Sequence, residues 1–180
     1  MSYLPSIPAK SVYTTNDEEA IGVAMILASG VASFSAGQTV TQNLAYFIPI
    51  QIPNSFTVAR FLWRNGATAA GNVTAALFNS AGTLQGTRTA STAQSGASGI
   101  QSAAPSGGNF TVGAGLYFMV IVSDSATATF AMCDWTVGYA RMLGVQEQAA
   151  NFALATPATL AAHSTDAKVP WIGISQLTTN

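Results

Sequence analysis

Short runs of β-branched and aromatic residues, separated by turn-forming residues, recur along this chain of 180 residues. Val, Ile, Phe, Tyr and Thr fill the runs, and Gly, Asn and Ser stand between them. This spacing is typical of all-β sandwiches and barrels. The pattern predicts strands at Ile21–Ala28, Leu44–Ile52, Phe56–Arg64, Asn72–Asn79, Leu84–Thr89, Gly115–Ser123, Thr127–Val137 and Val169–Ser175.

Turn residues predict how some of these strands connect. Gly82 occupies the last position of a turn that begins at Asn79, which favours a hairpin. The segment from Asp124 to Ala126 joins two strands that we expect to be adjacent and antiparallel. Pro49 cannot donate to a strand ladder, so Leu44–Ile52 is expected at a sheet edge or with a bulge.

One predicted strand is apolar on both faces. Leu116, Phe118, Val120 and Val122 alternate with Tyr117, Met119 and Ile121. A strand of this kind is covered on both sides. In a two-sheet sandwich the second cover would be a loop, a helix or another subunit.

Three segments are harder to assign. Asn16 to Ile21 resembles a helix start, but the residues that follow favour a strand. Gln146 to Leu154 is compatible with a short helix. The segment 149–167 consists mostly of Ala, Thr and Ser, and we expect an extended arm or a long loop there.

The chain is unusually poor in charge. Asp, Glu, Lys and Arg make up 7% of it, whereas about 25% is usual. The stretches Ala20–Ala59 and Thr89–Ser123 contain no charged side chain. Such a surface suits a protein covered by other subunits or one that works outside a cell. The net charge of -1 gives no electrostatic attraction to nucleic acid or to an anionic membrane, so neither is an expected partner.

Targeting and covalent signals are few. The residues after Met1 contain no basic region typical of a signal peptide. The longest apolar run, Ala20–Ala32, is shorter than the roughly 20 residues that a membrane-spanning helix needs. The single cysteine, Cys133, cannot form an internal disulfide, and it is expected to be buried as a small apolar residue.

Catalytic motifs are not convincing. The only histidine, His163, stands near Ser164 and Asp166, but triad members face one another from separate elements, and these residues share one loop-like segment. Asp124 and Asp134 flank the expected hairpin and could form a glycosidase pair. The favoured interpretation is that Asp124 caps its turn and Asp134 lies on an outer face. The sequence therefore predicts no catalytic, cofactor-binding or metal-binding residue, and a protein that is not an enzyme.

Aromatic residues are better candidates for binding. Sugars stack on exposed aromatic rings, so a carbohydrate platform could be built from Trp63, Trp135, Trp171, Tyr117 and Tyr139. The strand patterns around Trp63 and Trp135 favour the core instead. Trp171 is balanced between the core and an anchor at an interface between subunits.

Three segments together resemble β-sandwich domains of tailed-bacteriophage virion proteins, including head-decoration, baseplate and tail-fibre proteins. They are Phe56–Phe61, Gly71–Leu84 and Gly113–Val122. The shared pattern is a strand that ends in Leu-Phe or Leu-Tyr, a small-residue turn and a later Gly-Leu-Tyr strand. The resemblance covers roughly Leu44 to Thr136, contains no catalytic motif and implies no site residues.

These observations predict one all-β domain over 1–180, a two-sheet, jelly-roll-like antiparallel sandwich with extended N- and C-terminal segments. Its core is expected at about 21–139, with a C-terminal arm and last strand at 140–180. The expected function is structural: a virion component, made in the host cytoplasm, that assembles with itself and with capsid or tail proteins. A carbohydrate- or receptor-binding module, with a host-surface glycan as partner, is the alternative. The expected interface anchors are Trp171 and Ile172, at the end of an arm that reaches a neighbouring subunit.

Overall fold

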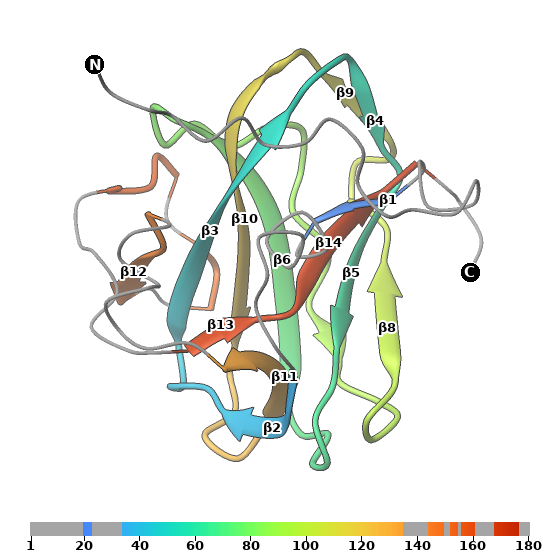
Figure 1. Cartoon of the computed structure of the whole chain (residues 1–180), viewed down its shortest axis with the longest axis vertical. Coiled ribbons are helices and arrows are strands. Elements are labelled where there is room, and N and C mark those ends of the chain that lie inside the picture. The colour runs from blue at the N-terminus through green and yellow to red at the C-terminus, as the bar shows by residue number, and fades with distance from the viewer. Residues whose placement is uncertain are drawn as a thin grey trace, which may run out of the picture.

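The computed structural model describes residues 20–22, 34–134, 144–149, 152–154, 156–160 and 168–176 (Figure 1). These residues form strands and connecting loops, and none of them is helical. Every strand pair among them is antiparallel. The prediction of an all-β chain is therefore confirmed.

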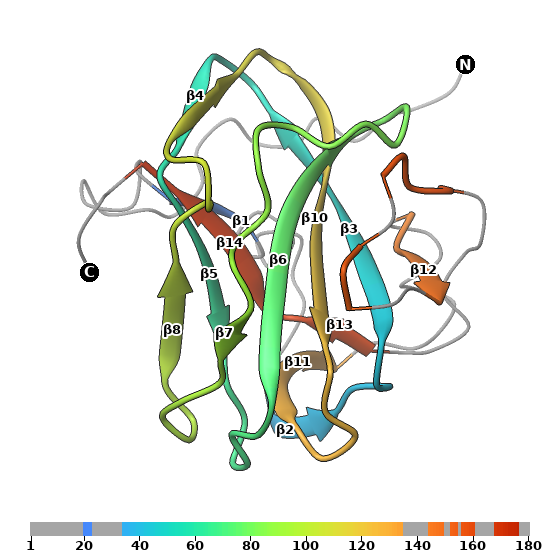
Figure 2. The ribbon, with the colours of Figure 1, turned by 180° about the vertical axis from the view of Figure 1, so that it is seen from behind.

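The strands form four sheets (Figures 1 and 2). The largest sheet has the order β12 (Gln146–Ala149), β3 (Leu44–Ile52), β10 (Gly115–Ser123), β6 (Asn72–Asn79) and β7 (Thr92–Ala93). A four-stranded sheet has the order β1 (Ala20–Gly22), β14 (Ile172–Ser175), β5 (Arg60–Arg64) and β8 (Ile100–Ala103). The smaller sheets contain β13 (Lys168–Pro170), β11 (Thr129–Asp134) and β2 (Phe34–Thr39), and β4 (Phe56–Val58) with β9 (Phe110–Val112).

The three central strands of the largest sheet, β3, β10 and β6, begin and end where the sequence predicts. Their alternating side chains fill two different cores. In β10, Tyr117, Met119 and Ile121 belong to the larger core, and Phe118 and Val120 belong to the smaller one. A period of two places successive side chains on opposite faces of the sheet.

Other predicted strands differ in detail. The run Phe56–Arg64 is divided at Ala59, whose N–H donates to Ser175 O at 2.8 Å, and it contributes to two sheets. The expected strand Leu84–Thr89 is reduced to isolated bridges at its two ends. The segment considered helical at Gln146 is strand β12, because pairing with β3 overrides its local preference.

The expected hairpin between β10 and β11 does not form. β10 pairs with β3 and β6, whereas β11 pairs with β13 and β2. The Asp124 carboxylate does not close a tight turn, because it accepts bonds from Asn72 N and Asn72 Nδ2 at 2.6 and 2.7 Å. The connection therefore leads the chain from one sheet into another.

Pro49 lies in a strand that is partly internal. β12 pairs with β3 only from Leu44 to Phe47, and Pro49 follows that paired stretch. On the opposite side, Pro49 is in register with Phe118 of β10. The prediction that β3 lies at a sheet edge therefore holds only for its second half, which has no partner strand on the β12 side.

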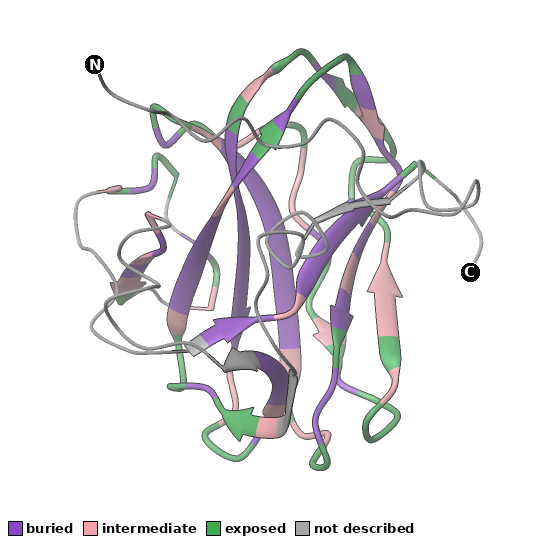
Figure 3. Ribbon diagram, in the orientation of Figure 1, coloured by how far each residue is buried: buried purple, intermediate pink, exposed green. Residues whose placement is uncertain are grey.

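Most residues of β6, β10 and β14 are buried, whereas β8 is half-buried or exposed (Figure 3). The larger core takes side chains from all four sheets, including Phe61 and Trp63 of β5, Phe130 of β11 and Phe56 of β4. The smaller core lies on the opposite face of the largest sheet, around Phe47 and Phe78. These two rings meet edge to face, with centroids 5.7 Å apart.

Candidate functional site

The two predicted interface anchors lie next to each other at the start of β14. Ile172 is 0% exposed, belongs to the larger core and is in register with Trp63. The prediction that Ile172 fills a pocket on a neighbouring subunit is therefore wrong, because the chain's own sheet contains it. Trp171 is half-buried against the same core, and its backbone N–H donates to Ala131 O at 2.9 Å. Its role at an interface stays a prediction.

The expected arm is also placed differently in its described part. Residues 152–154 and 156–160, which we call the strap, pack on the chain's own largest sheet (Figure 2). They do not extend away from the domain as an arm would. The rest of the expected arm between Ala149 and Lys168 lies outside the described residues.

Apolar contacts connect the strap to the smaller core. Leu154 and Ala158 are 4% and 8% exposed, and Phe152 and Leu160 are half-buried against the same cluster. The sheet residues beneath are Ala45, Phe47, Ala76, Phe78, Phe118, Val120 and Val122. Burial of each large side chain of this kind contributes about 1.5–3 kcal/mol, so the strap is a substantial part of the fold.

Polar contacts fix the position of the strap at three places. Arg88 Nη1 donates to Ala153 O and to Leu154 O, the latter at 3.2 Å. The Ala158 N–H donates to Gly82 O at 2.9 Å. The Thr159 N–H donates to Gln148 Oε1 at 3.3 Å. The partners belong to the hairpin that follows β6, in which Gly82 N donates to Asn79 O at 3.0 Å and Phe78 is bridged to Leu84, to the segment after it and to β12.

In the sequence, only the apolar residues on both faces of β10 indicated that a further segment covers the outer face of this sheet. The sequence left a loop, a helix or another subunit as alternatives, and the structure assigns the cover to a loop of the same chain. The strap residues show no strand or helix period, so their place on the sheet could not be derived from their own sequence.

The aromatic candidates do not form a described platform. Trp63 is 0% exposed and Tyr117 is buried, so both belong to the larger core. The prediction of a core role is confirmed for Trp63. Trp135 and Tyr139 lie outside the described residues. Trp171 is the remaining aromatic candidate with an exposed part.

The described residues bring few titratable side chains together. His163 and Asp166 lie outside the described residues, and Asp124 is bound to Asn72. Glu147 is buried within β12. In the described part of the chain, no three His, Cys, Asp or Glu residues are grouped as a metal site would require.

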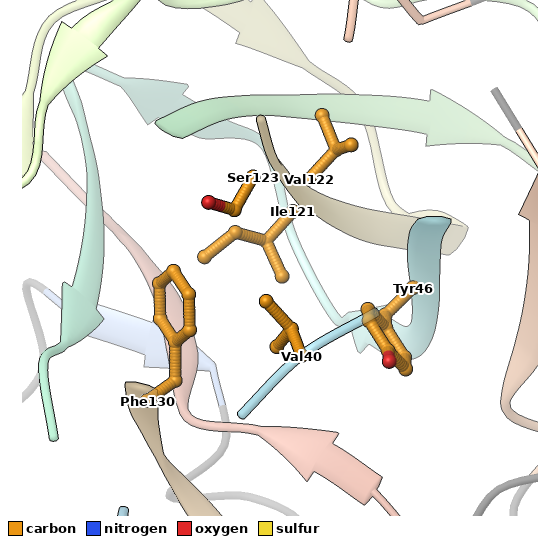
Figure 4. Close-up of a pocket in the computed structure, with 6 residues that line it drawn as sticks. All are labelled: Val40, Tyr46, Ile121, Val122, Ser123 and Phe130. Carbon is orange, nitrogen blue, oxygen red and sulfur yellow. The ribbon is translucent and has the colours of Figure 1, made fainter. Parts of the chain in front are cut away.

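A small pocket lies between β10, β11 and the end of β2 (Figure 4). It has no room for a water molecule. The lining is largely apolar: Val40, Tyr46, Ile121, Val122, Ser123 and Phe130. This pocket is therefore far smaller than the roughly 300–1,000 Å³ of a usual ligand-binding pocket.

A buried amide cluster joins Asn65, just after β5, to the segment between β7 and β8 and to β8 itself. Asn65 is 1% exposed. Its Nδ2 donates to Ser95 O at 2.6 Å and to Gly96 O and Gln101 Oε1 at 3.1 Å each. Its Oδ1 accepts from Gln94 Nε2 at 2.8 Å. Every polar atom of the Asn65 side chain is therefore bonded, which fixes the loops around it.

Charged side chains are rare on the part of the surface that the structure describes. Among the residues whose burial the structure describes, Arg64 is the only charged residue that is exposed. Arg60, Arg88 and Asp124 are partly covered, and Glu147 is buried. The exposed positions are instead mostly Ala, Gly, Ser, Thr, Asn and Gln.

No protein-family model matches the chain, and no curated protein is significantly similar to it. Within its described residues there is no helix with the length and apolar character needed to cross a membrane.

Proposed function

We propose that this chain is a non-enzymatic structural subunit of a bacteriophage virion. It assembles with copies of itself and with neighbouring capsid, tail or fibre proteins. The observation that carries the proposal is the neutral surface, on which Arg64 is the only exposed charged residue among those with described burial. The resemblance of segments 56–61, 71–84 and 113–122 to virion β-sandwich domains supplies the virion context.

A neutral surface lowers the cost of association. Removing an ionised group from water costs several kcal/mol unless it is paired. Small hydroxyl, amide and methyl groups are less costly to bury, and each polar group needs only one partner or a bridging water. A free protein, in contrast, normally keeps mixed charges on its surface that oppose association.

We propose further that the four-stranded and five-stranded sheets are the two layers of a jelly-roll-like sandwich. The support is the larger core, in which Phe61 and Ile174 of one sheet join Leu77 and Met119 of the other. Such a domain offers broad neutral surfaces on a rigid support, which suits repeated contacts between copies.

Sedimentation velocity over a series of protein concentrations tests the proposal. The chain is expected to associate, and the association is expected to persist between about 0.1 M and about 1 M salt, where the Debye length falls from about 10 Å to about 3 Å. A neutral interface is insensitive to this change. A chain that remains monomeric at every concentration, or complexes that salt dissociates, would contradict the proposal.

A further inference from the structure

Asn65 and Gly66 form the only Asn-Gly pair in the sequence. Asparagine is a thermolabile residue, because the backbone nitrogen of the next residue can attack its side-chain carbonyl carbon and displace the amide. Glycine has no Cβ atom to obstruct this attack, so Asn-Gly is the most reactive pairing. The pair lies just after β5, within the buried amide cluster described above.

The fold requires both members of this pair. Asn65 supplies the amide nitrogen of the cluster, and its Nδ2 donates to three acceptor oxygens. A Cβ atom on Gly66 would lie 2.5 Å from Thr129 Oγ1 and 2.8 Å from Gly37 Cα, so only glycine fits there. The reactive dipeptide therefore stands where neither residue can be exchanged without loss of hydrogen bonds or packing.

The native structure obstructs the attack at both reacting atoms. The Gly66 N–H donates to Thr129 O at 2.8 Å, which directs this nitrogen away from the side chain before it. To meet it, the Asn65 amide would have to turn and give up the bond from Gln94 Nε2 to Oδ1 at 2.8 Å, besides those of Nδ2. Asn65 is 1% exposed and Gly66 is buried, so water and hydroxide are kept from both.

We propose that Asn65-Gly66 is a latent deamidation site, which the folded chain protects and which opening of the amide cluster exposes. In the open chain the Gly66 nitrogen loses its proton and forms a bond to Asn65 Cγ, and the Cγ–Nδ2 bond breaks to release ammonia. Water then opens the succinimide ring at either carbonyl group, which leaves aspartate or isoaspartate at position 65. The reaction consumes water and needs no other reactant, and it does not depend on the proposed function.

Deamidation makes this opening irreversible. Either product places a carboxylate where Asn65 Nδ2 donates to three acceptor oxygens, and isoaspartate also lengthens the main chain. A carboxylate cannot replace that donor, and an uncompensated buried charge is strongly destabilising. Chains that stay unfolded long enough to react are therefore expected to be lost from the folded population.

Peptide mass spectrometry of the full chain tests the protection. The chain is incubated in mildly alkaline buffer with and without guanidinium chloride, and the deamidated fraction at Asn65 is followed over time. Asn54, which precedes Ser55 and is exposed between β3 and β4, is the internal control. The ratio of the Asn65 rate to the Asn54 rate is expected to be at least about tenfold lower in the folded chain than in the denatured chain, because only the small open population reacts.

Two results of this comparison would overturn the proposal. An equal ratio in the folded and denatured chains would show that the fold gives no protection. A denatured chain in which Asn65 reacts no faster than Asn54 would show that the pair is not a reactive site.

Gln94→Ala tests whether the amide cluster provides the protection. It removes the donor to Asn65 Oδ1 and is expected to accelerate deamidation at Asn65 in the folded chain, with Asn54 unchanged. Gln85→Ala, which removes an amide that donates to Thr83 O, is the matched control and should change neither rate. A folded Gln94→Ala chain that reacts like the wild type overturns protection by the cluster, and the wild-type comparison decides on its own if this variant does not fold.

Refolding tests the irreversibility. Chains held in guanidinium chloride until part of them has reacted are diluted into buffer, and folded chains are separated from the rest by size-exclusion chromatography. Deamidation at Asn65 is expected to be depleted in the folded fraction, and deamidation at Asn54 is expected to be equal in both. Equal deamidation at Asn65 in the two fractions overturns the irreversible step.

Discussion

The Gly82 carbonyl accepts a hydrogen bond from the Ala158 N–H at 2.9 Å, and a Cβ atom on Gly82 would lie 2.3 Å from Ala158 O. The β6 hairpin and the strap thus meet where only glycine fits. Gly82 also has a φ of 77°, which the turn after Asn79 requires. One residue therefore serves both the hairpin that the sequence predicts and the strap that it does not.

Gly82→Ala is expected to lower the free energy of unfolding by about 2–4 kcal/mol, since it adds a clash to the cost of a left-handed alanine. Gly96→Ala is the matched control. Gly96 has a φ of 75°, and nothing lies within 4 Å of its added Cβ, so its loss should be about 1 kcal/mol. Urea denaturation measures both. Equal losses in the free energy of unfolding would show that Gly82 is not in close contact with the strap.

Replacing asparagine by aspartate should strongly lower the free energy of unfolding at Asn65 and hardly change it at Asn79. Asn65→Asp places a carboxylate against three acceptor oxygens in a buried site, and a loss of about 3–5 kcal/mol is expected for an uncompensated buried charge. At Asn79, Oδ1 accepts from Ala81 N and Thr83 N. Asn79→Asp keeps both bonds and should leave stability almost unchanged.

Thermal and chemical unfolding of the two asparagine variants at neutral pH provide the comparison. A tolerated Asn65→Asp would mean that the amide cluster does not hold the loops together. A strongly destabilised Asn79→Asp would show that the hairpin depends on the amide nitrogen of Asn79.

Trp63→Ala should cost about 3–5 kcal/mol, as expected for removal of a large buried aromatic side chain. Trp63→Phe should cost less, because it retains a buried ring and the Nε1–H group that it removes has no hydrogen-bond partner among the described residues. Guanidinium denaturation separates the two variants. If Trp63→Ala is nearly neutral, Trp63 does not have the core position described above.

Arg88→Ala should release the strap, because the guanidinium joins two of its carbonyl groups to the segment after β6. Hydrogen bonds to charged groups contribute about 1.5–3 kcal/mol when buried, so a loss of about 1–2 kcal/mol is expected at this half-buried site. Hydrogen exchange should accelerate at 152–160. Arg64→Ala, which changes an exposed arginine, should leave that exchange unchanged, and equal exchange in both variants would contradict the role of Arg88.

Sequence reasoning was strongest for long strands with large apolar residues. β3, β6 and β10 are predicted at both ends, because their runs of Val, Ile, Leu and Phe are long and bounded by turn residues. Short strands such as β2 and β8 were missed. They contain Gly, Ser, Ala and Gln, and they exist because a neighbouring strand pairs with them, which no local pattern records.

The candidate site was less predictable than the fold. The core position of Trp63 followed from its strand pattern, and the need for a second cover followed from β10. The identity of that cover did not follow, because Phe152, Leu154 and Leu160 contact the sheet from an irregular segment. Ile172 was misassigned because an apolar strand near the end of a chain has the same pattern whether it pairs within its own subunit or with a neighbour.

Quantitative mass spectrometry of purified phage particles, from a lysate in which this chain is expressed, tests the proposed virion role most directly. The account predicts that the chain is present in intact particles at a fixed ratio to the major capsid protein, and that washing at high salt does not remove it. A chain that is abundant in the infected-cell lysate but absent from the purified particles would contradict a structural role in the virion.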